Sequence, residues 1–231
     1  RRFTSQGSDG STPEDRVYRY GLPTGVVQEL LSQGVPGPAA LVASWVVDDG
    51  KPSRSYRQAV LRPDWNYAGL HCLPQENLAL CVMLLAAAYT EASGNTATQP
   101  DHQWVDPFTQ PLTPALLQGL AAGIVDETNQ VRMDPAGYAA KLEGDLVKIP
   151  GQPVIRTVEG IAALDEAIAA LKSTAPVSAL TVSPGLNQAA ADHANNIGPR
   201  GEVGHSGTDN SLPGERIERY GTIPPNQRWG E

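Results

Sequence analysis

The sequence predicts an α+β protein in which two neighbouring strands stand between groups of helices along the chain. Segments 67–72 and 78–91 are apolar and are separated by a turn-forming stretch that begins at Pro74. Segments 114–132 and 159–173 repeat apolar residues at helical spacing. A hydrophobic content of 40% in 231 residues is sufficient for a sizeable core.

The chain before residue 50 is predicted to be helical. Ser11 and Pro13 are typical of a capped helix start, and the helical pattern continues over 25–31. A Gly- and Pro-rich loop follows, and Pro38 opens the next helix, which ends in the turn 48–54. One face of this second helix carries apolar residues at helical spacing, namely Leu41, Val42, Trp45 and Val46.

The next region is predicted to form strands. Segment 78–91 is apolar enough for a central strand that is buried on both faces. The chain's two cysteines, Cys72 and Cys81, lie on either side of the turn, so a hairpin would bring them together. They are either free thiols in the core or a disulfide, and a secreted location favours the disulfide. Their spacing does not suit zinc, because no second Cys/His pair accompanies them.

Segment 93–114 is predicted to be a linker, with Trp104 and Phe108 as its anchor points. Beyond it the pattern is helical again, with starts at Thr113–Pro114 and Ser183–Pro184. The predicted helices cover 114–132, 133–143, 159–173 and 183–198, with a loop at 149–153.

Composition argues against several classes of partner. A formal charge of −8 disfavours nucleic acid and anionic membrane surfaces. No apolar run reaches the roughly 18 residues that span a bilayer. No signal peptide is recognised, and the start at Arg1–Arg2 is what we expect of a processed or truncated product.

Residues 5–21 and 205–221 form an internal repeat without gaps. Eight of seventeen aligned positions are identical, and three further pairs are conservative. The identical pairs are Gly7/Gly207, Asp9/Asp209, Ser11/Ser211, Pro13/Pro213, Arg16/Arg216, Arg19/Arg219, Tyr20/Tyr220 and Gly21/Gly221.

Several spaced motifs make the chain resemble the CAP superfamily (cysteine-rich secretory protein, antigen 5, pathogenesis-related 1). NQVRMDPAGYAAKLE, ALTVSPGLNQAAADHANN and GHSGTDNSLPGERIERYG, with the closing RWGE, resemble the first part of such a domain. VASWVVDDGKPSRSYRQAVLRPDWNYAGLHC and LALCVMLLAAAYTE resemble its later part. We therefore expect residues 1–92 to be the later portion of a degenerate CAP domain, 93–114 a linker, and 115–231 the earlier portion of a second one.

The resemblance implies an α/β/α sandwich, with a three- or four-stranded, mainly antiparallel sheet between helical layers. It also implies a shallow cleft lined by histidines and glutamates. The family is mostly secreted and has no generally accepted enzymatic activity. Sterol, lipid, glycan, metal and protein binding are the roles proposed for it.

The cleft residues of the family are carried over one position at a time. His205 in GHSG matches the first cleft histidine, and Glu231 matches the glutamate of the Gly-Glu-Asn motif. Tyr56 replaces the second histidine. In the first copy Ser5 stands at the position of His205, and Glu29 matches Glu231 if two loop residues are deleted. Ser, Glu and Tyr are a poor donor set, so the first copy is expected to be metal-free.

His205 and Glu231 have two interpretations, a divalent-metal or proton-transfer pair and a polar cluster that ties a loop to the sheet. The second is favoured, because a third donor is missing. His193 is expected to pack or cap its helix. Ser206 lacks the G-x-S-x-G setting of a serine hydrolase, and the carboxylates lack EF-hand spacing.

Three functions follow, in order of preference. The first is a non-enzymatic extracellular structural module that associates with other protein chains, copies of itself, in a filament or coat. The second is a secreted module that binds a lipid, sterol or glycan near His205, and the third is a metal-assisted hydrolase. The two portions must close on each other, within one chain as a circular permutant or between neighbouring chains.

Overall fold

The fold is organised around β3 (Leu78–Ala86), to which β1 (Val27–Gly34) and β2 (Tyr67–Gln75) pair antiparallel on either side. The computed structural model describes residues 27–34, 37–75, 78–91, 112–144, 158–201 and 204–224. Within these ranges the sheet has four strands in the order β1-β3-β2-β5, and β5 (Thr181–Val182) runs parallel to β2. A second, two-stranded sheet joins β4 (Thr90–Glu91) to β6 (Gly221–Thr222).

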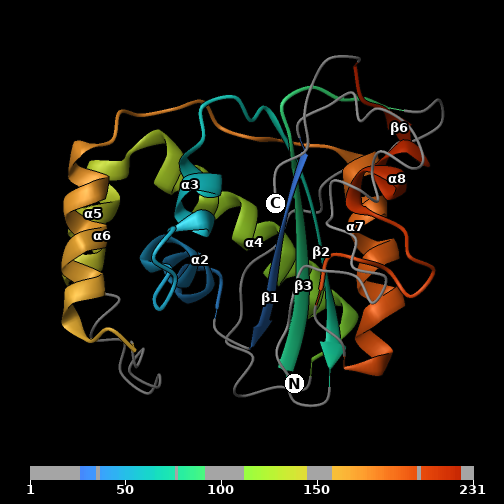
Figure 1. The fold of residues 1–231 in the computed structure, drawn as a ribbon, viewed down its shortest axis with the longest axis horizontal. Helices are drawn as coiled ribbons and strands as arrows, with labels where there is room; N and C mark the ends of the chain where they lie inside the picture. The colour runs from blue at the N-terminus through green and yellow to red at the C-terminus, as the bar shows by residue number, and fades with distance from the viewer. Residues whose placement is uncertain are drawn as a thin grey trace.

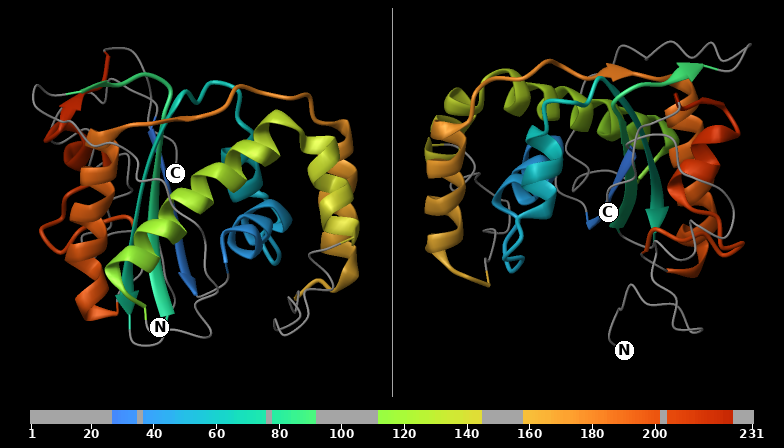
Figure 2. Two further views of the ribbon diagram at one scale, coloured as in Figure 1. Left: turned by 180° about the vertical axis from the view of Figure 1, so that it is seen from behind. Right: turned by 45° about the horizontal axis from the view of Figure 1, so that its top comes forward.

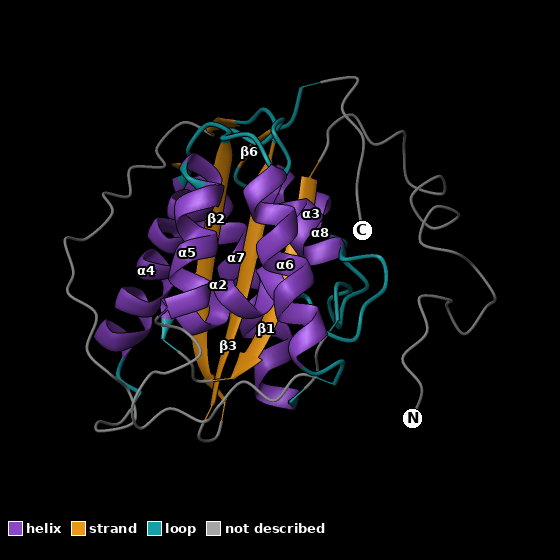
Figure 3. Ribbon diagram, turned by 90° about the vertical axis from the view of Figure 1, so that its left-hand side faces the viewer, coloured by secondary structure: helices purple, strands orange, loops and turns teal. Residues whose placement is uncertain are grey.

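Helices cover both faces of the main sheet (Figure 1). One face carries α2 (Pro38–Val47), α3 (Ser55–Leu61) and α4 (Pro114–Met133), with α5 (Pro135–Gly144) and α6 (Ile161–Ser173) further out. The other face carries α7 (Pro184–Ile197), the 3-10 turn η2 (Gly198–Arg200) and α8 (Pro213–Glu218). From the side of α5 and α6, the three long strands lie side by side behind the helices (Figure 3). The α+β class is confirmed.

The core has two parts because β3 is buried on both faces, as predicted. Successive strand side chains alternate between faces. Met83 and Leu85 pack in the cluster that contacts α2 and α4, whereas Leu84 and Ala86 pack in the cluster that contacts α7. All residues of β3 after Leu78 are buried.

The prediction that 25–31 is helical is wrong for its described part, because residues from Val27 onward form β1. This strand pairs with β3 over eight residues, from Val27↔Ala86 to Gly34↔Ala79. Its first five residues are all buried. A fully apolar central strand needs a partner on each edge, and this tertiary requirement outweighs a weak local helical preference.

Five of the helices and the hairpin agree with expectation where the structure describes them. α2, the β2–β3 hairpin, α4, α5, α6 and α7 are confirmed, with side-chain caps from Thr113 and Ser183. The sequence did not predict α3, α8, β5 or β6. Most of the linker and the helix expected from Ser11 lie outside the described residues, as does the 149–153 loop.

The described parts of the two predicted portions pack on one another. α4 crosses the layer that contains α2 (Figure 2), and its leucines enter the same hydrophobic cluster as Trp45 and Trp65. Arg132 of α4 is fully buried and donates to backbone carbonyls of the 60–65 stretch and of Ser178. Burial lowers the pKa of Arg132 to about 10.

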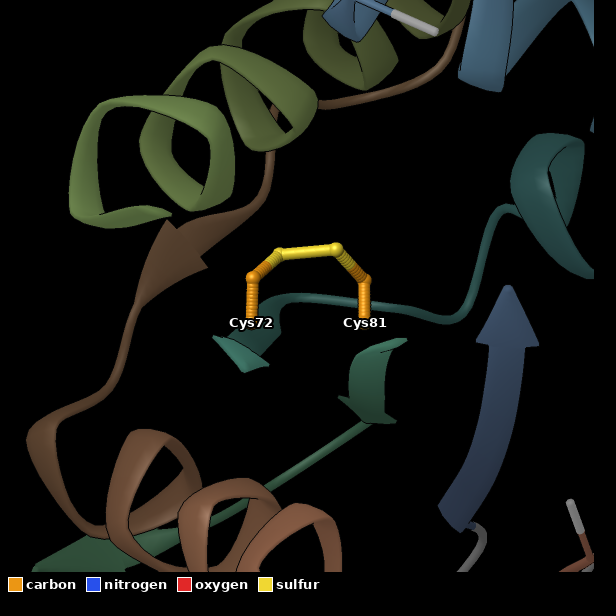
Figure 4. Close-up of a disulfide and its surroundings, with 2 residues drawn as sticks. All are labelled: Cys72 and Cys81. Atoms are coloured by element: carbon orange, nitrogen blue, oxygen red, sulfur yellow. A yellow bond between two sulfur atoms is a disulfide. The ribbon is translucent and has the colours of Figure 1, made fainter. Parts of the chain in front are cut away.

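Cys72 and Cys81 form a disulfide that joins β2 to β3 (Figure 4). The two residues are directly opposite in the strand register, and their Cα atoms are 4.1 Å apart. The predicted disulfide is therefore confirmed, and neither thiol is free.

Candidate functional site

The candidate site is built around Glu29, whose carboxylate is buried at the interface between the sheet and the layer of α7 and α8. Glu29 shares a face of β1 with Val27 and Leu31, which pack in the cluster that contains α7 and α8 residues. Only 1% of its side chain is exposed. A carboxylate in such a place needs partners, because burying an isolated charge is costly.

His205 is the first partner. It lies in the loop between η2 and α8, and its Nδ1 is 2.9 Å from Oε1 of Glu29. Because a carboxylate only accepts, Nδ1 is the protonated nitrogen. The side chain is 35% exposed, so His205 connects the buried carboxylate to the surface.

Arg216 of α8 is the second partner. Its Nη2 donates to Oε2 of Glu29 at 2.8 Å and to the carbonyl of His205 at 3.1 Å. Its Nη1 donates to the carbonyl of Ser211 at 2.6 Å. The guanidinium is 1% exposed; burial lowers the pKa of Arg216, and the Glu29 carboxylate opposes that shift. The pair is thus a buried, hydrogen-bonded ion pair.

His193 of α7 completes the set, which we call the Glu29 cluster (Glu29, His193, His205, Arg216). Its Nε2 donates to the carbonyl of Gly204 at 2.6 Å and lies 3.4 Å from Oε1 of Glu29. Burial lowers the pKa of His193, although the nearby carboxylate opposes this shift. Its Nδ1 is buried and has no hydrogen-bond partner among the described residues. We conclude that His193 is neutral near pH 7.

A tight turn positions these side chains. Gly207 donates to the carbonyl of Ser211 at 2.9 Å, and Ser211 donates through its backbone to Asp209 at 3.0 Å. The side-chain hydrogen bond of Ser211 and its backbone hydrogen bond lower the pKa of Asp209 to about 2. α8 then starts with Pro213, and the Glu215 carboxylate accepts from the backbone of Leu212.

The hydrogen bonds of the cluster decide which of its lone pairs could bind a metal ion. Oε1 of Glu29 accepts from the His205 imidazole and lies 3.4 Å from Nε2 of His193, and Oε2 accepts from the Arg216 guanidinium. The histidine nitrogens that face the carboxylate are protonated, so their neutral lone pairs point elsewhere. A metal ion would need those lone pairs. In the described part of the chain, no group of three or more His, Cys, Asp or Glu side chains is arranged to hold a metal ion.

Two of the predicted site residues are in contact in the structure, one lies elsewhere, and two lie outside the described residues. His205 and Glu29, which the resemblance assigned to different copies, are in contact. Tyr56 packs with the cluster on the other face of the sheet, and its hydroxyl donates to the carbonyl of Leu31 at 3.4 Å. Among the described residues, Glu29 accepts hydrogen bonds from His205 and Arg216, and Tyr56 is not one of its partners. Ser5 and Glu231 lie outside the described residues.

Two members of the Glu29 cluster were not predicted as site residues. His193 was expected to pack or cap its helix, and its burial agrees with packing. Arg216 was noted only as a residue shared by both repeats. Its presence in both copies was the available signal for a structural ion pair, but no pattern in the sequence named its partner.

A separate cavity of about 370 Å³ lies along β2, between that strand and α4. Most of its lining is apolar, and its polar side chains are Gln118, Asn187 and His71. Burial lowers the pKa of His71. No residue of the Glu29 cluster lines this cavity.

No known family model, curated protein or solved structure matches this chain. Among the helices that the structure describes, none combines the length and apolar character needed to cross a membrane.

Proposed function

We propose that this chain is a non-enzymatic extracellular structural module of the CAP type that associates with copies of itself. The observation that carries the proposal is the saturation of the Glu29 carboxylate. Its oxygens accept from Arg216 of α8 and from His205 in the loop between α7 and α8, and Nε2 of His193 in α7 lies 3.4 Å away. All three residues belong to the 112–224 part, whereas Glu29 belongs to the 27–91 part. The cluster is therefore an interface between the two parts of the chain.

The electrostatics of the cluster favour a structural role over catalysis. A general base needs a carboxylate or imidazole that exchanges a proton with substrate. Glu29 is neutralised by the Arg216 guanidinium at 2.8 Å, and neither side chain is more than 1% exposed. His205 alone reaches the surface, and its protonated nitrogen is directed at the carboxylate.

The proposed association uses the same interface between chains. Residues 92–111 connect the two parts, so the 112–224 part of one chain can bind the 27–91 part of another through the contacts described above. Such an exchange would keep β4 paired with β6, β2 paired with β5, and Glu29 paired with Arg216. Exchange of identical elements is a low-cost route to oligomers. The Cys72–Cys81 disulfide is compatible with an extracellular location.

Complementation between two variants tests this proposal. Chains with Glu29→Gln and chains with Arg216→Ala each lack the ion pair within one chain. An exchanged dimer of the two contains one intact Glu29–Arg216 pair, so mixing should give a dimer that is more stable than either variant alone. Sedimentation velocity gives the mass, and urea unfolding gives the stability. A wild type that stays monomeric at every concentration, with a mixture that behaves as the sum of its components, would refute the proposal.

A second function, binding of a lipid or sterol, is favoured by the apolar cavity along β2. The lining includes the disulfide residue Cys72 and the α4 residue Ala121. If the cavity binds an apolar ligand, fatty acids or sterols should raise the melting temperature of the wild type. Ala121→Trp should abolish the shift, whereas Ala115→Trp on an exposed position of the same helix should not.

A further inference from the structure

α6 begins with two apolar side chains that the fold leaves in solvent, Val158 and Ile161, which we call the apolar pair. Val158 is 89% exposed and Ile161 is 74% exposed. Among the described residues, the other large exposed hydrophobic side chains are Leu78 at 40% and Met133 at 52%. Single exposed apolar side chains are normal on soluble proteins, but two close together that gain nothing from the fold indicate a contact surface.

The backbone that carries the apolar pair is held by the turn between α2 and α3. The Asp49 carboxylate accepts hydrogen bonds from the backbone N–H groups of Val158 and Glu159. The Glu159 carboxylate accepts from the backbone of Gly50 at 2.7 Å and from Arg54 through two bonds of 2.7 Å. Because this backbone is already fixed, a partner that binds the pair loses little conformational entropy in ordering it.

The cavity of about 370 Å³ along β2 is a receptor of matching chemistry. Most of its lining is apolar, and the exposed residues Pro74, Pro114 and Gln118 are part of the lining, so the cavity opens at the surface. Its volume lies in the range of about 300–1,000 Å³ that is typical of ligand pockets. The cavity is therefore large enough for two branched aliphatic side chains.

The charges of the two surfaces are compatible. No Lys, Arg, Asp or Glu is found among the described residues that line the cavity. Burial lowers the pKa of His71, so its imidazole is neutral near pH 7. Beside the apolar pair, Glu159 is neutralised by Arg54, and Asp49 is hydrogen-bonded to the backbone. Contact between the two surfaces therefore buries no carboxylate that lacks partners, which would be costly.

The apolar pair cannot reach the cavity of its own chain. α6 lies at one end of the molecule and α7 at the other (Figure 1, Figure 2). The cavity is lined mainly by β2 and α4 and by Asn187 of α7, and no residue of α6 is part of its lining. A second copy of the chain offers the same cavity without this restriction, so the partner that fits is another copy.

We propose that Val158 and Ile161 of one chain insert into the β2 cavity of the next chain. The two surfaces are different, so the contact is heterologous, and a pair of joined chains still presents one free apolar pair and one free cavity. Repeated addition extends the assembly into a filament, or into a ring if the rotation closes. This contact rests on the proposed self-association, for which it supplies a surface, but not on the exchange of parts between chains.

Sedimentation velocity over a concentration series tests this contact with substitutions at exposed positions. Ile161→Asp puts a charge on the apolar pair, and Gln118→Trp fills the mouth of the cavity. Each should weaken association by at least about tenfold, because the contact loses its apolar burial. Two matched controls should associate like the wild type: Met133→Asp at another exposed hydrophobic position, and Ala115→Trp at an exposed α4 position that is not part of the cavity lining.

A mixed disulfide reports the contact directly. Chains with Ile161→Cys are mixed with chains with Gln118→Cys, oxidised and mapped by mass spectrometry, with the Cys72–Cys81 peptide as a check of native pairing. We expect a 161–118 disulfide between chains. Mixing Met133→Cys with Gln118→Cys should give at most a trace of the corresponding product. No 161–118 disulfide, or association that Ile161→Asp leaves unchanged, would overturn the proposal.

The same measurements separate this contact from the exchange of parts. Association that persists with Ile161→Asp while Glu29→Gln and Arg216→Ala complement each other would support exchange and overturn this contact. Association that Ile161→Asp weakens, without that complementation, supports this contact and overturns exchange. A wild type that is monomeric at every concentration overturns both. If Gln118→Trp abolishes a melting-temperature shift by fatty acids or sterols but leaves association unchanged, the cavity holds a small apolar ligand and this contact is overturned.

Discussion

Replacing Glu29 by glutamine is the most direct test of the Glu29 cluster. The substitution keeps the size and one oxygen acceptor of the side chain but removes its charge. The Arg216 guanidinium, 1% exposed, would then be a buried cation without an anion. If its nitrogen took the place of Oε1, the new amide group would also present N–H donors where the carboxylate had accepted from His205.

The expected cost is about 3–5 kcal/mol in free energy of unfolding, the range for removing one partner of a buried ion pair. This is a large share of the roughly 5–15 kcal/mol that stabilises a typical domain. The lower end applies if the imidazole of His205 changes tautomer and accepts from the amide. His205→Gln should cost less, about 1 kcal/mol, because the side chain is 35% exposed and its loss leaves the ion pair intact.

Urea unfolding followed by tryptophan fluorescence measures these changes, since Trp45 and Trp65 are buried in the core. A double-mutant cycle with Arg216→Met separates the ion pair from other effects. The double variant lacks both charges, so it should be more stable than the sum of the single effects predicts, by up to about 3 kcal/mol. A loss below about 1 kcal/mol for Glu29→Gln, or strict additivity in the cycle, would refute the assignment of Glu29 as the group that stabilises α8 on the sheet.

Three further predictions concern the rest of the fold. Because burial lowers the pKa of His193, the unfolded chain takes up a proton below about pH 6.5 while the folded chain does not. The free energy of unfolding should therefore fall as the pH decreases, by up to about 1.4 kcal/mol per pH unit. Urea titrations at several pH values should show a smaller slope for His193→Gln. Opening the disulfide with Cys72→Ala/Cys81→Ala should lower the free energy of unfolding by about 2–3 kcal/mol, from the entropy of a loop of about ten residues, and an unchanged urea midpoint would contradict this. Gly69→Ala would place a Cβ 2.1 Å from the α7 backbone and should lower the free energy of unfolding by about 1–3 kcal/mol. Gly50→Ala has open space around the new Cβ but a φ of 74°, and it should lower the free energy of unfolding by about 1 kcal/mol or less. Equal melting temperatures for the two variants would show that α7 does not pack this closely on β2.

Local signals predicted α2 and α4 to α7. α4 and α7 start where a capping residue precedes proline, and both caps are made by the side chains of Thr113 and Ser183. The central position of β3 also followed from the sequence, because its residues are apolar on both faces. In each case the information lies within the segment itself.

Non-local contacts explain what the sequence did not reveal. β1 is a strand because it fills the free edge of β3, a partner about 50 residues away in sequence. α3 is only seven residues long, and it follows Arg54, which has a left-handed backbone with φ of 49° and does not resemble a capping signal. Neither feature leaves a periodic pattern in its own segment.

In the site, too, local signals identified individual residues but not the non-local contacts between them. Glu29 and His205 were identified through the resemblance and the repeat, but their contact joins positions 176 apart in sequence. Arg216 is 187 positions from Glu29, and nothing in either segment identifies the other as its partner. The two alternatives for His205, catalysis and loop attachment, therefore required the third group, a guanidinium, to be located in space.

The two copies of the repeat can be compared to ask whether the imidazole or the guanidinium of the Glu29 cluster is the essential group. If the cluster served proton transfer or metal binding, its imidazole would be the essential group and its guanidinium would be replaceable. The first copy has the opposite pattern, with Ser5 at the imidazole position and Arg16 at the guanidinium position. The structure gives the physical reason, since the guanidinium neutralises a carboxylate that is 1% exposed, whereas the imidazole adds one further hydrogen bond at a partly exposed edge. Loss of the imidazole leaves Glu29 paired, and loss of the guanidinium leaves a buried anion without its cation. The group shared by both copies is thus the one that the fold needs, which argues for a structural role of the cluster.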